Sequence, residues 1–138
     1  MDKVTLDAYL FFDGTCGQAM EFYQEIFGGE LRMQTYDEVP GDMLGKEEMK
    51  GKIIHASLMG GGVNLMASDA HEKSLGTGKI ELSLSGYDDE KLRKIFQALS
   101  AGGQVKSPLR KEFWGDTFGT LTDGFGVDWM VNIAVKKE

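Results

Sequence analysis

The amino-acid sequence predicts an α+β fold in which two tandem βαβββ modules form a curved mixed sheet around a concave cavity, with the helices on the outer face. The order strand, helix, strand, strand, strand occurs twice along the chain. The segment GGGVNLMAS at 60–68 also aligns with GFGVDWMVN at 124–132 at one constant offset, as expected for a duplicated unit. We expect a single domain over residues 1–138, with repeats at about 4–68 and about 78–135.

The first repeat is expected to contain one helix among four strands. Residues 6–12 alternate between two faces, which is typical of a strand. Thr15 and Gln18 have the spacing of a capping box, and the apolar residues after them recur at helical intervals as far as Gly28, a residue that suits a helix end. Further strands are expected at 31–35, 52–59 and 63–68, with a charged loop at 37–51 and a glycine turn at 60–62.

The second repeat follows the same order of elements. A strand at 80–84 precedes a helix for which Asp88 is the expected N-cap, and Gly102 and Gly103 are expected to end that helix. Its apolar stripe consists of Leu92, Ile95, Phe96 and Leu99. The remaining strands are expected at 104–111, 117–122 and 127–135.

Composition and charge exclude several classes of function. The chain has 41% hydrophobic and 27% charged residues, which is typical of a globular protein. Its formal net charge of -7 disfavours binding to nucleic acid or to anionic lipid. No apolar run is long enough for a membrane span and the N-terminus lacks the pattern of a signal peptide, so we expect a cytoplasmic protein. With Cys16 as its only cysteine, the chain cannot form an intrachain disulfide.

Strand alternation predicts which side chains line the cavity. If the even-numbered residues of the first strand pack on the helices, the odd-numbered ones face inward. The inward set is then Asp7, Tyr9, Phe11, His55, Ser57, Asn64, Met66, Lys79, Glu81, Ser83, Asp128, Met130 and Asn132. Methionine, tyrosine and a few polar groups suit the capture of a small organic molecule. The residues expected to contact it are Tyr9, His55, Met66, Glu81, Trp114 and Met130.

His55 and Glu81 are the candidate catalytic residues, and each also has a structural interpretation. His55 lies between apolar neighbours, where a histidine serves as a metal ligand, a base or a hydrogen-bonded structural residue. Lys79 is two residues from Glu81 on the same face and could neutralise it. His71 is expected to be solvated, and Cys16 is expected to pack in the first helical turn rather than act as a nucleophile.

The remaining aromatic residues and the long loop leave alternatives open. Trp114 and Phe113 precede a strand, where Trp114 would either cover the cavity or lie in a dimer interface. Trp129 is expected to pack beneath the helices. The loop at 37–51 would be either a lid over the cavity or an ordinary surface loop.

Three segments give the chain a family resemblance: YLFFDGTCGQAMEFYQEIFGGEL at 9–31, KIIHASLMGGGVNLMASD at 52–69 and FWGDTFGTLTDGFGVDWMVNI at 113–133. The chain resembles the PhnB-like group of the glyoxalase, bleomycin-resistance and extradiol-dioxygenase superfamily, also called vicinal oxygen chelate proteins. Members of this group are often labelled as similar to a demethylubiquinone methyltransferase. This chain lacks the glycine-rich strand-to-helix turn of a nucleotide-type cofactor site, which argues against that label.

The resemblance implies metal-ligand positions on the first and last strands of each repeat, and this sequence departs from them. The expected glutamate positions correspond to Met66 and Met130, so no metal is expected there, because a thioether is a poor ligand for hard or borderline ions. The histidine positions fall near Asp7 or Tyr9 in the first repeat and near Lys79 or Glu81 in the second. His55, Glu81 and Asp7 remain weak candidates for metal ligands.

The resemblance and the residues together favour a protein that binds a small organic molecule in the cavity, with the usual metal ligands replaced. The alternative is a divalent-metal-dependent lyase, isomerase or dioxygenase that uses His55, Glu81 and Asp7. A third interpretation is an interaction module. A divalent metal is the one cofactor that the resemblance admits, and a homodimer is expected. A cationic ligand would suit the net charge, whereas a phosphonate would find only Lys79.

Overall fold

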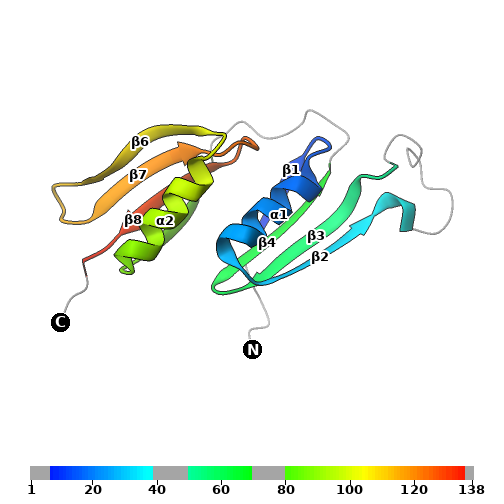
Figure 1. The fold of residues 1–138 in the computed structure, drawn as a ribbon, viewed down its shortest axis with the longest axis horizontal. Coiled ribbons are helices and arrows are strands. Elements are labelled where there is room, and N and C mark those ends of the chain that lie inside the picture. Colours follow the sequence, from blue (N-terminus) through cyan, green and yellow to red (C-terminus); the bar gives the residue numbers. More distant parts are fainter. Residues whose placement is uncertain (1–6, 39–49, 70–79, 136–138) are drawn as a thin grey trace. The chain divides into compact units, whose positions relative to one another are not determined.

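The computed structural model describes residues 7–38, 50–69 and 80–135 of the chain. The chain divides into two compact units, Met1–Leu75 and Gly76–Glu138, and the division falls in the connection between the two predicted repeats. Each unit has the element order strand, helix, strand, strand, strand (Figure 1). The prediction of an α+β fold with two βαβββ modules is therefore confirmed.

The first unit pairs its strands into one mixed sheet. Its elements are β1 (Ala8–Phe12), α1 (Cys16–Phe27), β2 (Glu30–Thr35), a 3-10 turn η1 (Tyr36–Glu38), β3 (Ile53–Gly60) and β4 (Val63–Asp69). The strand order is β1-β4-β3-β2. β1 and β4 run parallel, whereas β3 is antiparallel to both β2 and β4.

The second unit repeats this arrangement. Its elements are β5 (Leu82–Gly86), α2 (Asp89–Ser100), β6 (Gln104–Lys111), β7 (Thr117–Thr122) and β8 (Asp128–Ile133). The order β5-β8-β7-β6 has the same parallel pair of first and last strands. β5 begins two residues later than the sequence predicts, and its register pairs Leu82 with Trp129 and Ser83 with Met130 of β8.

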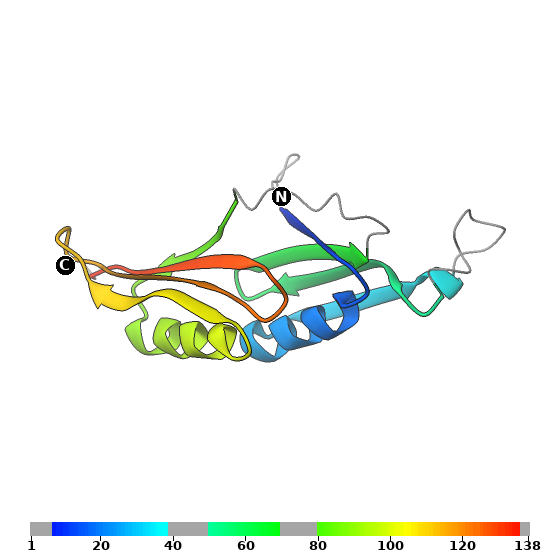
Figure 2. The ribbon, with the colours of Figure 1, turned by 90° about the horizontal axis from the view of Figure 1, so that it is seen from above.

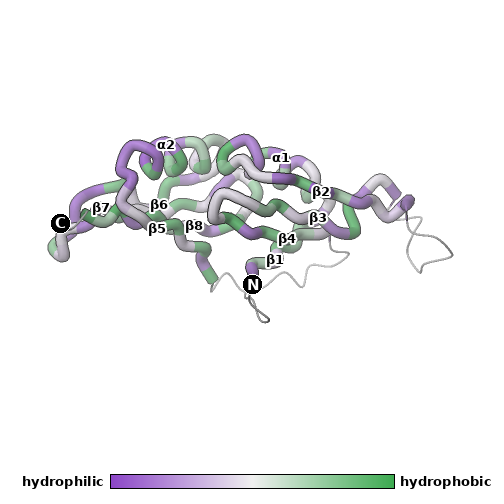
Figure 3. Tube along the Cα trace, turned by 90° about the horizontal axis from the view of Figure 1, so that it is seen from below, coloured by the Kyte–Doolittle hydropathy of each residue, from purple (hydrophilic) through white to green (hydrophobic). Residues whose placement is uncertain are grey.

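Each helix packs on one face of its own sheet, and that interface is the core of the unit (Figure 2). Along both helices hydrophobic and hydrophilic segments alternate, as an amphipathic helix requires (Figure 3). The fully buried core side chains include Met20, Tyr23 and Leu58 in the first unit and Leu99, Leu121, Trp129 and Val131 in the second. Burying an aliphatic or aromatic side chain of this size contributes about 1.5–3 kcal/mol, which makes the alternating apolar pattern decisive for the fold.

The start of α1 differs from the sequence prediction. Thr15 is the N-cap residue, but its side chain makes no capping hydrogen bond, so the predicted capping box with Gln18 is wrong. The buried carboxylate of Asp69, at the end of β4, replaces it: Oδ1 accepts from the backbone N–H of Cys16 at 2.9 Å and Oδ2 from that of Ile53 at 2.9 Å. A carboxylate beside the first N–H groups of a helix is favourable both as an acceptor and as a charge.

The helix boundaries in the second unit follow local signals. Asp88 caps α2 as predicted, with Oδ1 accepting from the N–H of Lys91 at 3.2 Å. Gly103 follows α2 at a position where a Cβ would lie 2.2 Å from the carbonyl oxygen of Thr122, so only glycine allows this close approach of two backbones.

Among the residues described by the structure, no helix has the length and apolar character needed to cross a membrane.

Candidate functional site

The candidate site is built on the face of each sheet opposite its helix, called here the open face of that unit. In the first unit, Tyr9 of β1 lies beside Met66 of β4, Met66 beside Ser57 of β3, and Ser57 beside Arg32 of β2. These residues form one row across the sheet. The prediction that odd-numbered residues of the first strand face away from the helix agrees with the burial of Phe12 and the exposure of Phe11.

Three rings gather on the open face of the first unit. The ring of Tyr9 lies 5.1 Å from that of Phe11 and 5.8 Å from that of His55, measured between centroids. The Tyr9 hydroxyl oxygen is 3.2 Å from Nδ1 of His55, at hydrogen-bonding distance. Tyr9 is 39% exposed and Phe11 54% exposed, and His55 is also exposed. We call these three residues the aromatic cluster; it holds two of the predicted contact residues, Tyr9 and His55.

The open face of the second unit has an equivalent row with different chemistry. Ser83 of β5 lies beside Met130 of β8, and Met130 lies beside Thr120 of β7. Met66 and Met130 thus occupy matching positions, each next to the first strand of its unit. The histidine positions implied by the resemblance were Asp7 or Tyr9 in the first unit and Lys79 or Glu81 in the second. The register places Tyr9 beside Met66 and Ser83 beside Met130, so neither Lys79 nor Glu81 lies next to the methionine of β8.

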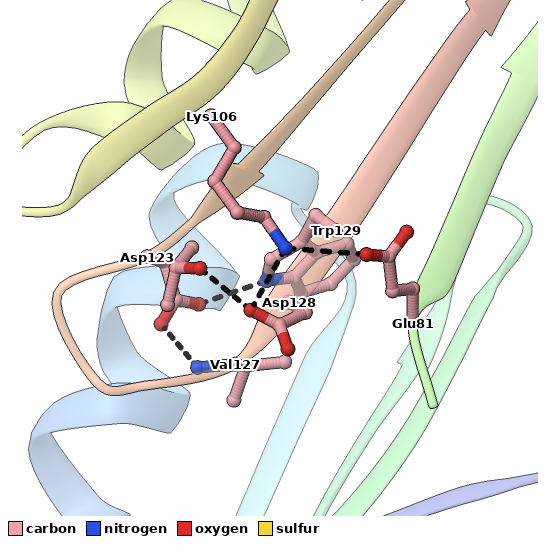
Figure 4. Close-up of polar contacts among 7 residues, drawn as sticks. Glu81, Lys106, Asp123, Val127, Asp128 and Trp129 are labelled. Atoms are coloured by element: carbon pink, nitrogen blue, oxygen red, sulfur yellow. Dashed lines mark hydrogen bonds and ion pairs between the residues drawn. The ribbon is translucent and has the colours of Figure 1, made fainter. Parts of the chain in front are cut away.

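Glu81, two residues before Ser83 in the chain, lies in an ion-pair network with Lys106 and Asp128 (Figure 4). Lys106 Nζ is 3.2 Å from Glu81 Oε2 and 3.4 Å from Asp128 Oδ1, and the Thr122 hydroxyl donates to the same Asp128 oxygen at 2.6 Å. These contacts, above all the hydrogen bond with Glu81, raise the pKa of Lys106 above its usual 10.5. Glu81 is therefore neutralised, but by Lys106; the predicted partner Lys79 lies outside the described residues. Lys106 is 25 positions from Glu81, so local spacing gave no sign of the pair.

A buried carboxylate that the sequence analysis missed supports the turn before β8. Asp123 Oδ1 accepts from the backbone N–H of Phe125 at 2.9 Å and of Val127 at 3.0 Å, while Oδ2 accepts from the indole N–H of Trp129 at 2.8 Å (Figure 4). Trp129 is buried in the core, as predicted. The Asp-Gly sequence at 123–124 was a turn signal, but it did not reveal the contact with the indole.

Trp114 lies in the loop between β6 and β7. Its ring is 5.0 Å from that of Phe113 and 6.1 Å from that of Phe118 on β7. Phe118 lies beside Asn132, whose side-chain amide donates to Asp116 Oδ2 at 3.0 Å. Trp114 is 51% exposed and Phe113 95% exposed, so both interpretations of Trp114, as a ligand contact and as an interface residue, remain predictions.

Cys16, Asp7, His71 and the loop at 37–51 are the remaining features that the sequence singled out. Cys16 is fully buried, and burial, followed by the charge of Asp69, raises its pKa to about 12, which is unsuited to a nucleophile and agrees with the structural interpretation. Asp7 is half-buried at the start of β1. His71 and most of the loop at 37–51 lie outside the described residues; within the described part, Asp37 Oδ2 accepts from the N–H of Gly51 at 3.1 Å.

Over 7–38, 50–69 and 80–135, no group of three or more His, Cys, Asp or Glu side chains is placed to hold a metal ion.

Comparison with known proteins gives consistent results. The family profile described as "Glyoxalase/Bleomycin resistance protein/Dioxygenase superfamily" matches residues 5–131. The chain is 31% identical to protein YjdN of Escherichia coli over 142 aligned positions, covering 93% of this chain and 94% of that one. Protein PA1353 of Pseudomonas aeruginosa, a solved structure, is 36% identical with a TM-score of 0.85, covering 97% of this chain and all of that one, 100%.

A second solved structure bears on the predicted subgroup. It is a protein from Bacillus cereus described as "Putative 3-demethylubiquinone-9 3-methyltransferase, PhnB protein". It is 26% identical to this chain with a TM-score of 0.75, and the match covers 95% of this chain and 100% of that one. The resemblance to PhnB-like proteins predicted from the sequence is confirmed.

Proposed function

Because the chain belongs to the Glyoxalase/Bleomycin resistance protein/Dioxygenase superfamily, we propose that it binds a small organic molecule on the open faces of its βαβββ units. The observation that carries this proposal is the aromatic cluster. Tyr9 and Phe11 keep 39% and 54% of their surface exposed on a sheet face that a helix does not cover. Covering apolar surface of this kind gains about 25 cal/mol per Å². An exposed aromatic patch beside polar side chains is a common feature of a ligand site.

The donor atoms on the two rows support a role without the metal chemistry that the family implies. The pairs that lie side by side on the first and last strands are Tyr9 with Met66 and Ser83 with Met130. A phenol, a hydroxyl and two thioethers are poor ligands for the divalent ions that polarise oxygen substrates, which prefer carboxylate and imidazole. These residues do not fit such an ion.

A homodimer belongs to the same proposal. β1 and β5 are edge strands of their own four-stranded sheets. Edge strands carry backbone groups that readily pair with another chain, and two-fold symmetric dimers are the most frequent oligomers. Light scattering coupled to size exclusion measures the state directly: a mass near twice the 15.2 kDa of one chain is expected, and a mass of one chain at micromolar concentration contradicts it.

The binding proposal is tested by thermal shift on protein purified without an affinity tag. One series contains neutral and cationic aromatic fragments, and the other contains Mn, Fe(II), Co, Ni and Zn. A fragment present at ten times its Kd is expected to raise Tm by about 4 °C. Phe11→Ala should abolish this shift, whereas the matched control Phe113→Ala, with an exposed aromatic residue of the second unit, should retain it.

The opposite result would favour the other function. A stoichiometric metal in the purified protein, with a clear shift on adding that metal and none with any fragment, contradicts the binding proposal. It would direct attention to a divalent-metal-dependent lyase, isomerase or dioxygenase, for which His55 and Glu81 remain the candidate residues.

A further inference from the structure

His55 has a single protein partner on the open face of the first unit. Within the residues that the structure describes, its only hydrogen bond or ion pair is the one with the Tyr9 hydroxyl at Nδ1. The residue is exposed, and no described residue forms a hydrogen bond with its other nitrogen, Nε2. A neutral imidazole has one protonated and one unprotonated nitrogen, and a hydrogen bond at one nitrogen determines which of them carries the proton.

The contact with Tyr9 favours one tautomer of the neutral imidazole. A neutral phenol is a good hydrogen-bond donor, and an unprotonated ring nitrogen is the acceptor that suits it. When the Tyr9 O–H donates to Nδ1, the proton of the neutral imidazole lies on Nε2. Tyr9 is then a positioning residue for His55, and His55 offers an N–H donor at the edge of the aromatic cluster.

The neighbours of the cluster disfavour a cation at this position. The side-by-side partners on adjacent strands are Met66 for Tyr9, Ser68 for Phe11 and Gln34 for His55, and none of them is a carboxylate. Arg32, in the same row as Tyr9, forms an ion pair with Glu30 at 3.0 Å. The carboxylate nearest to Tyr9 in sequence is Asp7, two residues before it, and it is already engaged in another interaction. An ammonium group beside His55 would therefore have no uncommitted counter-charge among these residues, despite the net charge of -7 for the whole chain. An uncharged oxygen acceptor would find the Nε2–H donor.

We propose that His55, fixed as the Nε2–H tautomer by Tyr9, donates a hydrogen bond to a carbonyl-type oxygen of a neutral aromatic ligand whose ring lies against Tyr9 and Phe11. This inference rests on the proposed binding function and specifies its ligand class. It assigns Tyr9 two separate roles: the ring contacts the ligand, and the hydroxyl orients the imidazole.

The experiment uses nitrogen-15-labelled full-length protein and two probes that differ in hydrogen-bonding type. Acetophenone has an aromatic ring with an acceptor, and benzylammonium has an aromatic ring with a donor and a charge. Imidazole nitrogen spectra should show the Nε2–H tautomer of His55 without ligand. Titration with acetophenone should shift the signals of His55 Nε2, Tyr9 and Phe11, and acetophenone should bind more tightly than benzylammonium.

Two variants separate the roles. His55→Phe keeps a ring but removes the donor, and it should weaken acetophenone binding by about threefold to tenfold, the range for one net hydrogen bond, while leaving benzylammonium unchanged. Tyr9→Phe keeps the tyrosine ring but removes the hydroxyl, so part of the His55 population should move its proton to Nδ1, and acetophenone should bind a few-fold more weakly. Phe113→Ala, in the second unit, should change neither probe.

Four results would overturn the inference. An Nδ1–H tautomer in the parent protein contradicts the orienting role of Tyr9, and unchanged acetophenone affinity in His55→Phe contradicts the donor role. If benzylammonium shifts the cluster and acetophenone does not, the binding function stands and the ligand class is wrong. If neither probe shifts any residue of the open face, the proposed function is contradicted as well.

Discussion

The two βαβββ units use one strand arrangement but anchor it with different polar groups. In both, the first strand runs parallel to the last, and a methionine of the last strand, Met66 or Met130, lies beside the first. In the first unit the open face carries the aromatic cluster, whereas in the second it carries the network of Lys106, Glu81 and Asp128. The two units therefore share the same strand pairing, whereas the polar and aromatic side chains of their open faces differ.

The buried carboxylates differ in the same way. Asp69 ends β4 and caps α1, while Ile133, at the matching position of β8, is an apolar core residue. The second unit instead caps α2 locally through Asp88 and places its buried carboxylate, Asp123, in the turn before β8. Among the residues that the structure describes, each unit thus has one buried acid that satisfies backbone donors, at a different place in the fold. Replacing these acids, and the residues of the open faces, tests how far the two units differ.

The largest effect is expected at Asp123. Asp123→Ala removes the acceptor for two backbone N–H groups and for the indole of Trp129, all within 3.0 Å, and should lower the free energy of unfolding by about 4 kcal/mol. Urea denaturation measures the loss. Asp123→Asn keeps an acceptor oxygen for the backbone and should lose about half as much. A loss under about 1 kcal/mol in the alanine variant would show that the turn is held by other contacts.

The second-largest loss of stability is expected at Asp69. Asp69→Ala leaves the buried N–H groups of Cys16 and Ile53 without their acceptor and should cost about 3 kcal/mol. The matched control is Asp88→Ala, which removes the exposed local cap of α2 and should cost about 1 kcal/mol. Equal losses for the two variants would contradict the conclusion that the helices are anchored differently.

A metal site should be easier to create in the first unit than in the second. Tyr9→His with Met66→Glu would place an imidazole and a carboxylate side by side, with His55 as a third donor within reach of position 9. Zinc at a hundred times its Kd should then stabilise this variant by about 2.7 kcal/mol. Ser83→His with Met130→Glu has Thr120 in the row and Phe118 in the next. The carboxylates two residues before these positions, Glu81 and Asp128, are already paired with Lys106, so this variant should bind zinc more weakly. Equal zinc affinity of the parent protein would contradict the proposal that the ligands are replaced.

The smallest effect is expected from the ion pair of the second unit. Lys106→Met removes contacts to Glu81 and Asp128 that are partly exposed, so the loss should stay below about 1 kcal/mol. The raised pKa of Lys106 sets the sign: its stabilisation is complete below pH 10.5 and is lost as pH rises through the folded-state pKa. The difference between variant and parent should be equal at pH 7 and pH 9 and should disappear at more alkaline pH. A difference that grows with pH would contradict this assignment.

Most of the fold could be predicted from the sequence because it depends on local patterns. The strands at 104–111 and 117–122 were predicted with the observed bounds, and Asp88 was identified as a cap from its spacing alone. The errors came from contacts between residues distant in sequence. Asp69 reaches α1 across 53 positions and Lys106 reaches Glu81 across 25, and neither distance leaves a periodic signal.

The candidate site was predicted less completely for the same reason. Alternation correctly put Tyr9 and Met66 on one face, since a strand has a period of two. It could not show that Tyr9 bonds to His55, because the registers of β1 on β4 and of β4 on β3 bring them together. It also left the partner of Met130 on β5 undetermined: Lys79, Glu81 and Ser83 were all expected on that face, and only the register of β5 on β8 shows that Ser83 lies beside Met130.

The two ways of capping a helix have a consequence for the order of folding. The first turn of α2 is capped by Asp88, three positions before Lys91, so its cap needs no contact that is distant in sequence. The first turn of α1 is capped by Asp69, 53 positions away, and the chain between them must close as a loop before that hydrogen bond can form. In a refolding experiment, the amides in the first turn of α2 should gain protection from hydrogen exchange before those of α1. The unit whose helix cap comes from a distant strand should therefore complete its helix later.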